Sequence, residues 1–416
     1  MKTISIQLDT PMKWYLTAAS VLLLLLTIFA PLLGVSFAAL NVVYLTAWSF
    51  LHKEKRGEHF LGRMLVGIML CNLFLVLYFA CFGAGDSAET AAGYQETLQI
   101  GSLMKTNMAA CLKAVASGIK ATGASLLPTV FIAPLLDLFG GGFLAYVLLL
   151  FNLFLVPFLM IISLILRDIH PRLSPLVFLF APFLAPVLGG SLDVTGLIYV
   201  ALWIYAVFKQ TLRKKGAKNA AVLGILSFLL VSLRWQYFYF VTGTLFSLLL
   251  SCIVRRLFDK TYNAKTLFIS IGIVFGVFFC LTVLFLHPYI HFTNFGQEDT
   301  GAFIQNLQMI FAYYGAVPLL FSLLGILGLW RRHFRQFTLF LIFYLLITCL
   351  LFPGSANPGQ QYLFAPALFL LAVVGVSSLP KLKKTARVAL YAVCSVGLLC
   401  LYLPEAPAFL RILFSA

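Results

Sequence analysis

The chain has 416 residues, of which 62% are hydrophobic and only 10% are charged. A soluble protein of this size needs roughly a quarter charged residues to cover its surface, so the composition excludes a soluble globular protein and indicates an integral membrane protein. The formal net charge is +16, but most Lys and Arg residues stand in short loops between apolar stretches. The charge therefore does not indicate binding to nucleic acid.

The apolar stretches predict an all-α fold, a polytopic bundle of about thirteen transmembrane helices in a single membrane domain over residues 1–416. The predicted spans run approximately over residues 14–33, 36–52, 62–82, 143–166, 173–190, 194–209, 219–234, 236–256, 265–287, 309–330, 337–352, 361–380 and 387–403. The first stretch continues directly into the second, so we expect an uncleaved anchor rather than a signal peptide.

The connections between the spans alternate between basic loops and loops almost free of Lys and Arg. The basic loops contain Lys53–Arg56, Arg213–Lys215, Arg255–Arg256, Arg331–Arg335 and Lys381–Lys384. Short basic loops stay on the cytoplasmic side of a membrane. We therefore expect a multi-pass protein of the plasma (inner) membrane, with a cytoplasmic N-terminus and an extracytoplasmic C-terminus.

Two longer connections fall on the predicted outer side, at residues 83–142 and 287–308. In the first, one arc of a helical wheel gathers apolar side chains, with lysines on the adjoining face, which predicts a helix in the headgroup layer. The apolar residues are Met104, Met108, Cys111, Leu112, Val115 and Ile119, and the lysines are Lys105, Lys113 and Lys120. A second piece from Leu127 to Phe139 ends at three glycines, which is typical of a juxtamembrane helix with a glycine stop.

Acidic residues on the outer side are few, and Asp86 is the most informative. They are Asp86, Glu89, Glu96, Asp137, Asp193, Glu298, Asp299 and Glu405. Asp86 follows a span directly, where a carboxylate can take a proton from a hydroxyl or hold a sugar hydroxyl or a metal ion. Alternatively, Asp86 caps a helix that starts at Ser87, with Glu89 completing a capping box. Asp193 has the same two interpretations, with a helix beginning near Val194.

Arg234 is nearly the only arginine on the outer side, and it stands beside Trp235. A guanidinium there either binds a lipid phosphate bidentately or extends to ordinary headgroups next to an aromatic belt. His287 and His291 could bind a metal together with Asp299 or Asp86, but an i, i+4 pair in a loop is a weak signal, and the alternative is two surface histidines without a ligand. The cysteines show neither metal nor disulfide spacing. No metal ligand or cofactor is assigned, and a divalent metal stays an open alternative.

Five segments together resemble the GT-C superfamily of membrane glycosyltransferases, which includes protein O-mannosyltransferases and lipid A aminoarabinose transferases. The segments are Asp86–Glu89, Leu127–Gly140, Leu192–Val194, Leu233–Trp235 and Gln361–Pro366. They are similar, in that order, to the acidic motif of the first outer loop, the juxtamembrane helix, a second acidic position, a basic donor-phosphate position and the segment opening a late helix. The sequence departs from the pattern at Leu127, where the family has a basic residue, and at Gln361, where it has arginine.

The resemblance implies transfer of a hexosyl or pentosyl group from a polyprenyl-phosphate-linked donor to an extracytoplasmic lipid, glycan or protein, with membrane lipids around the site. It implies that Asp86, with Glu89 and Asp193, forms the catalytic acidic site. It also implies that Arg234, Gln361 and Tyr362 bind the donor phosphate.

A transporter or flippase of lipid-linked saccharides is the rival interpretation, and it needs polar groups near the middle of the membrane. Asn41, Asn72 and Asn152 are uncharged and scattered along the sequence. The acids gather at one face, which favours a surface reaction. A polymerase or ligase of lipid-linked glycans would share that site.

Overall fold

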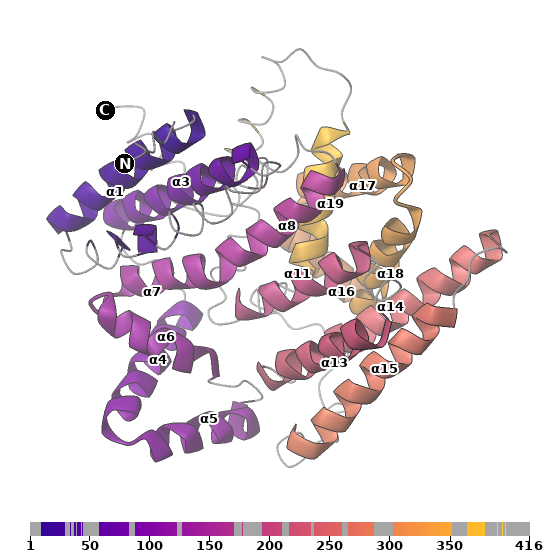
Figure 1. The fold of residues 1–416 in the computed structure, drawn as a ribbon, viewed down its shortest axis with the longest axis horizontal. Helices are drawn as coiled ribbons and strands as arrows, with labels where there is room; N and C mark the ends of the chain where they lie inside the picture. Colours follow the sequence, from indigo (N-terminus) through magenta and orange to yellow (C-terminus); the bar gives the residue numbers. More distant parts are fainter. Residues whose placement is uncertain are drawn as a thin grey trace, which may run out of the picture.

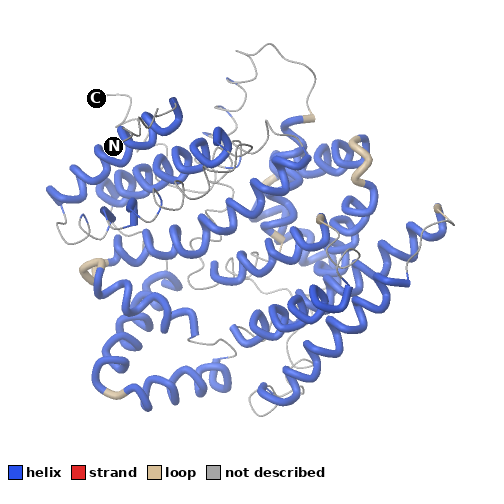
Figure 2. Tube along the Cα trace, in the orientation of Figure 1, coloured by secondary structure: helices blue, strands red, loops and turns tan. Residues whose placement is uncertain are grey.

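The computed structural model describes mainly helical segments. They are residues 10–29, 58–82, 88–122, 127–169, 194–209, 216–233, 237–259, 265–286, 303–351 and 364–378, with the isolated residues 34, 37, 38, 40–42, 44, 177, 389, 393 and 396. Every regular element in this part of the chain is a helix (Figure 2). Four of these helices are long and apolar enough to cross a membrane, or five if one bent pair is a single span. The all-α class is confirmed, and the number of about thirteen membrane spans stays a prediction.

Figure 1 shows how the helices are arranged. The N-terminal half contains α1 (Thr10–Phe29), α3 (Glu58–Phe82), α4 (Ala88–Thr106), α5 (Met108–Thr122), α6 (Leu127–Leu138), α7 (Phe143–Leu150), the π-helix η1 (Phe151–Leu155) and α8 (Val156–Ile169). The C-terminal half contains α11 (Val194–Phe208), α13 (Gly216–Leu233), α14 (Tyr237–Phe258), α15 (Lys265–Leu281), the π-helix η4 (Thr282–Leu286), α16 (Phe303–Tyr314), α17 (Ala316–Arg331), α18 (Arg335–Leu351) and α19 (Ala365–Ser377).

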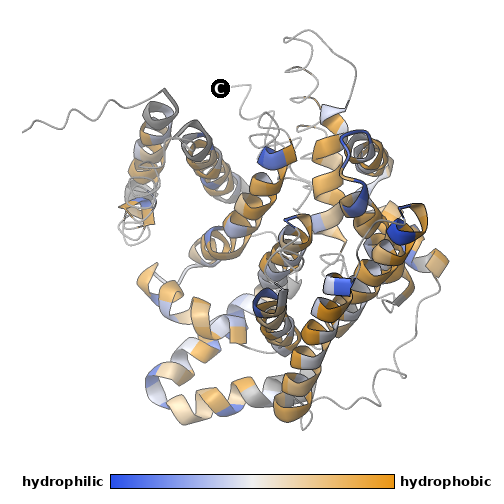
Figure 3. Cartoon of the chain, turned by 45° about the vertical axis from the view of Figure 1, so that its right-hand side comes forward, coloured by the Kyte–Doolittle hydropathy of each residue, from blue (hydrophilic) through white to orange (hydrophobic). Residues whose placement is uncertain are grey.

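Most predicted spans in the described ranges coincide with one helix, because a helix satisfies the backbone hydrogen bonds of an apolar segment that has no water around it. The spans predicted at 36–52, 173–190 and 387–403 lie outside the described residues, apart from a few isolated positions. In Figure 3, hydrophobic residues cover most of the helix lengths, whereas α4 and α5 mix hydrophobic and hydrophilic residues.

Two predicted helices are wrong in their continuity. The amphipathic helix expected across Met104 to Ile119 is broken at Asn107, whose side-chain oxygen accepts a hydrogen bond from the Ala110 amide at 3.0 Å. This is N-capping by asparagine, so α5 starts afresh instead of extending α4. The span expected at 309–330 is broken at Gly315, whose φ of 75° is open mainly to glycine, and the flanking helices differ in direction by 110°.

The helices α17 and α19 pack so closely that their backbones touch. A Cβ atom on Gly325 would collide with the Leu371 carbonyl oxygen, and one on Gly375 would collide with the Phe321 carbonyl oxygen. The Ser322 hydroxyl, at the same interface, donates to the Leu368 carbonyl oxygen at 3.0 Å. Small residues bring helices together in membranes because lipid leaves no hydrophobic force to do so, and close van der Waals contact takes its place.

The asparagines do not remain scattered, because Asn72 of α3 and Asn152 of η1 pair with each other. The Asn152 amide donates to Asn72 Oδ1 at 2.8 Å, and the Asn72 amide donates to Asn152 Oδ1 at 3.1 Å. The Tyr44 hydroxyl also donates to Asn152 Oδ1, at 2.8 Å. The two asparagines are 80 positions apart in the chain, so their pairing is a tertiary contact between neighbouring helices.

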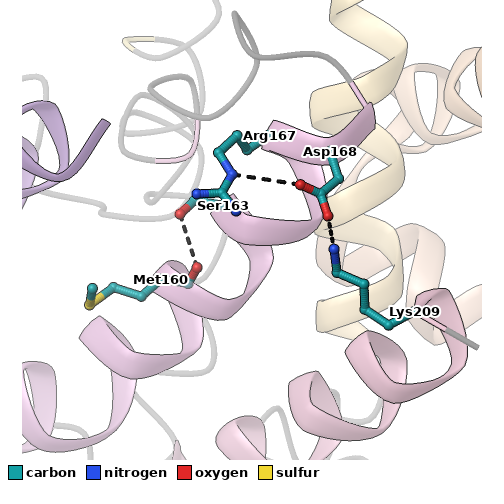
Figure 4. Close-up of polar contacts among 5 residues, drawn as sticks. All are labelled: Met160, Ser163, Arg167, Asp168 and Lys209. Carbon is teal, nitrogen blue, oxygen red and sulfur yellow. Dashed lines mark hydrogen bonds and ion pairs between the residues drawn. The ribbon is translucent and has the colours of Figure 1, made fainter. Parts of the chain in front are cut away.

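Three contacts place the ends of six helices at one face of the bundle. Lys209, after α11, forms an ion pair with Asp168 near the end of α8 (Figure 4). Arg255 of α14 donates to Gln336 Oε1 of α18 at 2.6 Å, and Arg332, after α17, donates to Ser377 Oγ of α19 at 3.3 Å.

The aromatic ring of Phe208, beside Lys209, joins these groups, because its centroid lies 5.5 Å from that of Phe334 and 5.0 Å from that of Phe337. We call this end of the molecule the basic face, defined by Arg167, Lys209, Arg255 and Arg332. The helices α8 and α11 both end there, as do α17 and α19, whereas α18 begins there.

Candidate functional site

Most of the residues predicted to form the catalytic and phosphate sites lie outside the described part of the chain. They are Asp86, Asp193, Arg234, Gln361 and Tyr362. Glu89 belongs to the first turn of α4, where only its backbone is described. The capping interpretation of Asp86 requires a helix that starts at Ser87. The described part of α4 begins one residue later, at Ala88. The site described here is therefore built from the helices that flank these positions.

The helices α4, α5 and α6 form a compact three-helix unit, at the lower left of Figure 1. Its small core contains Ile100 of α4, Cys111 of α5 and Ala133 of α6, each almost fully buried. Lys105 Nζ lies 2.9 Å from Asp137 Oδ2, an ion pair between α4 and α6 that is largely exposed. Exposed pairs of this kind contribute at most about 1 kcal/mol, so apolar packing holds the unit together.

The α6 helix ends as the glycine pattern predicts. Gly140 and Gly141 have φ values of 88° and 70°, the left-handed conformation that stops a helix at little cost only in glycine. The Tyr94 hydroxyl of α4 donates to the Gly141 carbonyl oxygen at 2.6 Å. This bond ties α4 to the turn that leads into α7, so the glycine stop also fixes where α7 begins.

An aromatic cluster joins α4 to the first turns of α7. The ring of Tyr94 meets Phe143 edge-on with centroids 5.4 Å apart, and its centroid lies 5.6 Å from that of Tyr146. Tyr146 is completely buried. Aromatic pairs at such distances add about 0.5–1.5 kcal/mol beyond the area that they bury.

The Tyr146 hydroxyl is the least satisfied polar group of this cluster. It is buried and makes no hydrogen bond of good geometry within the described residues. Its polar neighbours on α4 are Thr97 and Glu96. The Thr97 hydroxyl donates to the Gly93 carbonyl oxygen at 2.7 Å, so its proton is already engaged. The Thr97 oxygen can still offer Tyr146 a lone pair, but that contact does not meet hydrogen-bond geometry. Water or a ligand usually completes the hydrogen bonding of a buried hydroxyl in this situation.

Glu96 adds an acid beside the Tyr146 hydroxyl, with its side chain partly exposed to solvent. Desolvation raises the pKa of the Glu96 carboxyl above its ordinary value. A carboxyl with a raised pKa exchanges a proton closer to neutral pH and binds hydroxyl groups in either protonation state. We call the group formed by Tyr94, Glu96, Thr97 and Tyr146 the α4–α7 corner. Its chemistry suits a molecule that carries hydroxyl groups.

Glu96 belongs to the predicted outer acids, but no sequence motif assigned a role to it or to Tyr146. The available signal was weak: a tyrosine in the first turn of an apolar helix, just after a glycine stop. The contacts of α4 with α6 and with the start of α7 bring these two side chains together.

The α4–α7 corner and the basic face lie at opposite ends of one helix. The segments α7, η1 and α8 form a continuous helix of 27 residues. At 1.5 Å per residue, its length is about 40 Å, and the hydrocarbon core of a bilayer is about 30 Å thick. In Figure 4 the far end of this helix carries Arg167 and Asp168, with Lys209 reaching Asp168 from α11.

Within the described ranges, no three His, Cys, Asp or Glu residues are grouped closely enough to hold a metal ion. No protein-family model, curated protein or solved structure matches this chain. The resemblance to GT-C enzymes therefore rests on the sequence motifs alone.

Proposed function

We propose that the protein is a membrane glycosyltransferase that moves a sugar from a polyprenyl-phosphate-linked donor to an acceptor hydroxyl at the outer face of the membrane. The observation that supports this most is the position of the α4–α7 corner. The Glu96 carboxyl, whose pKa partial burial raises, and the buried, poorly satisfied Tyr146 hydroxyl lie at the end of a membrane-length helix whose other end belongs to the basic face. The positive-inside rule assigns the basic face to the cytoplasm, so the corner faces outward.

In this proposal the chemistry belongs to Asp86, in the short connection between the end of α3 at Phe82 and the start of α4 at Ala88. Its carboxylate accepts the proton of the acceptor hydroxyl while the acceptor oxygen bonds to the anomeric carbon. The bond from that carbon to the phosphate oxygen breaks, and polyprenyl phosphate leaves with the electron pair. A direct displacement of this kind inverts the anomeric centre.

The remaining predicted residues act on charge and position. Arg234, with Gln361 and Tyr362, holds the donor phosphate and stabilises the charge that develops on it, which accelerates the reaction only if that contact strengthens in the transition state. Glu89 and Asp193 complete the acidic site. Glu96 and Tyr146 of the α4–α7 corner bind hydroxyl groups of the acceptor and so orient it.

The test uses the purified full-length chain in proteoliposomes with polyprenyl-phosphate-linked hexose and pentose donors and with a cell-envelope extract of lipids, glycans and proteins as the acceptor. It measures release of free polyprenyl phosphate together with labelled sugar bound to the extract. We expect release from the wild type, with none from Asp86→Asn. Asp137→Asn is the matched control and should retain activity. Asp137 lies in the three-helix unit of α4, α5 and α6, where it pairs at the surface with Lys105. Full activity of Asp86→Asn would remove that residue from the mechanism.

The same assay separates the rival classes. Movement of labelled donor across the bilayer without release of polyprenyl phosphate identifies a flippase and overturns the proposal. Growth of a lipid-linked glycan identifies a polymerase or ligase that uses the same outer site. The saturated Asn72–Asn152 pair does not favour the transporter, because its amides already bond to each other and to the carbonyl oxygens of Ile68 and Leu148.

A further inference from the structure

We propose that Arg332 binds the phosphate group of an anionic membrane lipid at the basic face, between the ends of α17 and α19. This site lies at the opposite end of the bundle from the α4–α7 corner, and it does not depend on the glycosyltransferase proposal.

The guanidinium of Arg332 is incompletely hydrogen-bonded within the described residues. Arg332 Nη2 donates to Ser377 Oγ at 3.3 Å, which is a long hydrogen bond. Arg332 Nη1 is buried and has no partner within the described residues. Burial lowers the pKa of Arg332, because the charged form loses part of its hydration. A buried cationic donor is costly unless an anion accepts its protons.

The turn at the end of α17 fixes the backbone of Arg332 in this position. The α17 helix ends in a Schellman motif, in which the Phe334 amide donates to the Leu329 carbonyl oxygen and the His333 amide to that of Trp330, both at 3.2 Å. His333 occupies the left-handed position of this motif with a φ of 64°. This conformation is uncommon outside glycine, so the turn that directs Arg332 toward α19 is held by its surroundings.

The serine hydroxyls at the end of α19 do not neutralise the charge of Arg332. Gly328 lets Ser378 pack against α17, since a Cβ atom on Gly328 would collide with the Ser378 hydroxyl. The hydroxyls of Ser377 and Ser378 both donate to the Val374 carbonyl oxygen, at 2.5 and 3.0 Å. With their protons engaged, these hydroxyls offer Arg332 only lone pairs, and two neutral oxygens do not neutralise a guanidinium.

The residues around Arg332 favour a lipid phosphate as the ligand. Arg335 lies over the ring of Trp330, 5.9 Å from its centroid, and Trp330 is 41% exposed. Trp and Arg together mark the headgroup level of a membrane protein. The adjacent Arg331 and Arg335 make the surroundings of Arg332 strongly cationic, which attracts anionic lipids. Phosphate supplies several acceptor oxygens, and guanidinium binds them bidentately.

The experiment counts phosphatidylglycerol molecules bound to the purified full chain by native mass spectrometry, with inorganic phosphate alone as the second arm. We expect saturable binding of one phosphatidylglycerol, weakened at least about tenfold in Arg332→Gln, since a charge-assisted hydrogen bond contributes that much or more. Arg331→Gln removes an equal charge from the neighbouring exposed position and should bind almost as well as the wild type. Arg332→Lys keeps the charge without the bidentate geometry, so intermediate binding is expected.

Each outcome decides between alternatives. Equal lipid binding by Arg332→Gln and Arg331→Gln overturns the proposal, because binding then follows net charge rather than this site. If Arg332→Gln does not fold, binding by Arg332→Lys that equals the wild type overturns it instead. Inorganic phosphate that protects the wild type but not Arg332→Gln from thermal unfolding, with no effect of the lipid, overturns the lipid source and retains a free-phosphate site.

Discussion

Asn72 and Asn152 hold α3 against η1 through a reciprocal pair of amide hydrogen bonds, 2.8 and 3.1 Å long. Each amide also donates to the carbonyl oxygen four residues earlier on its own helix. Asn152 sits in the π-helical turn that interrupts the long helix from Phe143 to Ile169. The pair therefore joins two spans that are distant in sequence, at a place where the backbone ladder is already irregular.

Replacement of these asparagines by leucine should destabilise the protein unequally. Asn152→Leu removes the acceptor of both Asn72 and Tyr44, so we expect a loss of about 1–2 kcal/mol, against about 0.5–1 kcal/mol for Asn72→Leu. The double variant should cost less than the sum, because the second change removes an already unpaired amide. Unfolding in detergent micelles measures all three. Strict additivity would show that the two amides are energetically independent.

Gly325→Ala should separate α17 from α19. The added methyl group meets the Leu371 carbonyl oxygen, which is backbone and cannot rotate away, so we expect a loss of about 1–3 kcal/mol. Gly272→Ala is the matched control, since a Cβ atom there meets nothing within 4 Å on α15. The better helix propensity of alanine should make that variant neutral or more stable by up to about 1 kcal/mol. Thermal unfolding should therefore shift to lower temperature in Gly325→Ala and not in Gly272→Ala, and equal shifts would contradict the close packing of α17 and α19.

His333→Gly should stabilise the turn after α17. Glycine adopts a φ of 64° without the steric penalty of a side chain, and after allowance for its more flexible unfolded state we expect a gain of about 0.5–1 kcal/mol. His333→Ala keeps the penalty, so it should give no gain in the same unfolding measurement. If alanine and glycine behave alike, the strain at this position does not limit stability.

The stability of the three-helix unit of α4, α5 and α6 should depend on pH through Glu96. Desolvation raises the pKa of Glu96 above its ordinary 4.5, so the folded state retains a proton that the unfolded state has lost. The free energy of unfolding should therefore be highest below that ordinary value and fall as pH rises through the raised pKa. Glu96→Gln should flatten this slope in unfolding measured from about pH 4 to about pH 7. Asp137→Asn should leave the Glu96 slope in place, and a slope that persists in Glu96→Gln belongs to another group.

Local signals in the sequence predicted the helices well. Apolar runs predicted α3, α8, α14 and α15, and the glycines at 140–142 predicted the end of α6. These features depend on neighbours within a few residues, which the sequence displays directly. The breaks at Asn107 and Gly315 escaped notice because a single polar or glycine residue inside a periodic pattern is tolerated in many helices.

The sequence by itself determined that this is a helical membrane protein with its charge gathered in short basic loops, because hydropathy and charge order act on each segment separately. Tertiary structure alone decided which side chains meet: Asn72 with Asn152, Glu96 with Tyr146, and Arg332 with Ser377. These contacts depend on which spans pack together and in what direction. Close backbone contact at small residues and the hydrogen bonding of buried polar groups set that arrangement, and neither has a periodic signature along the chain.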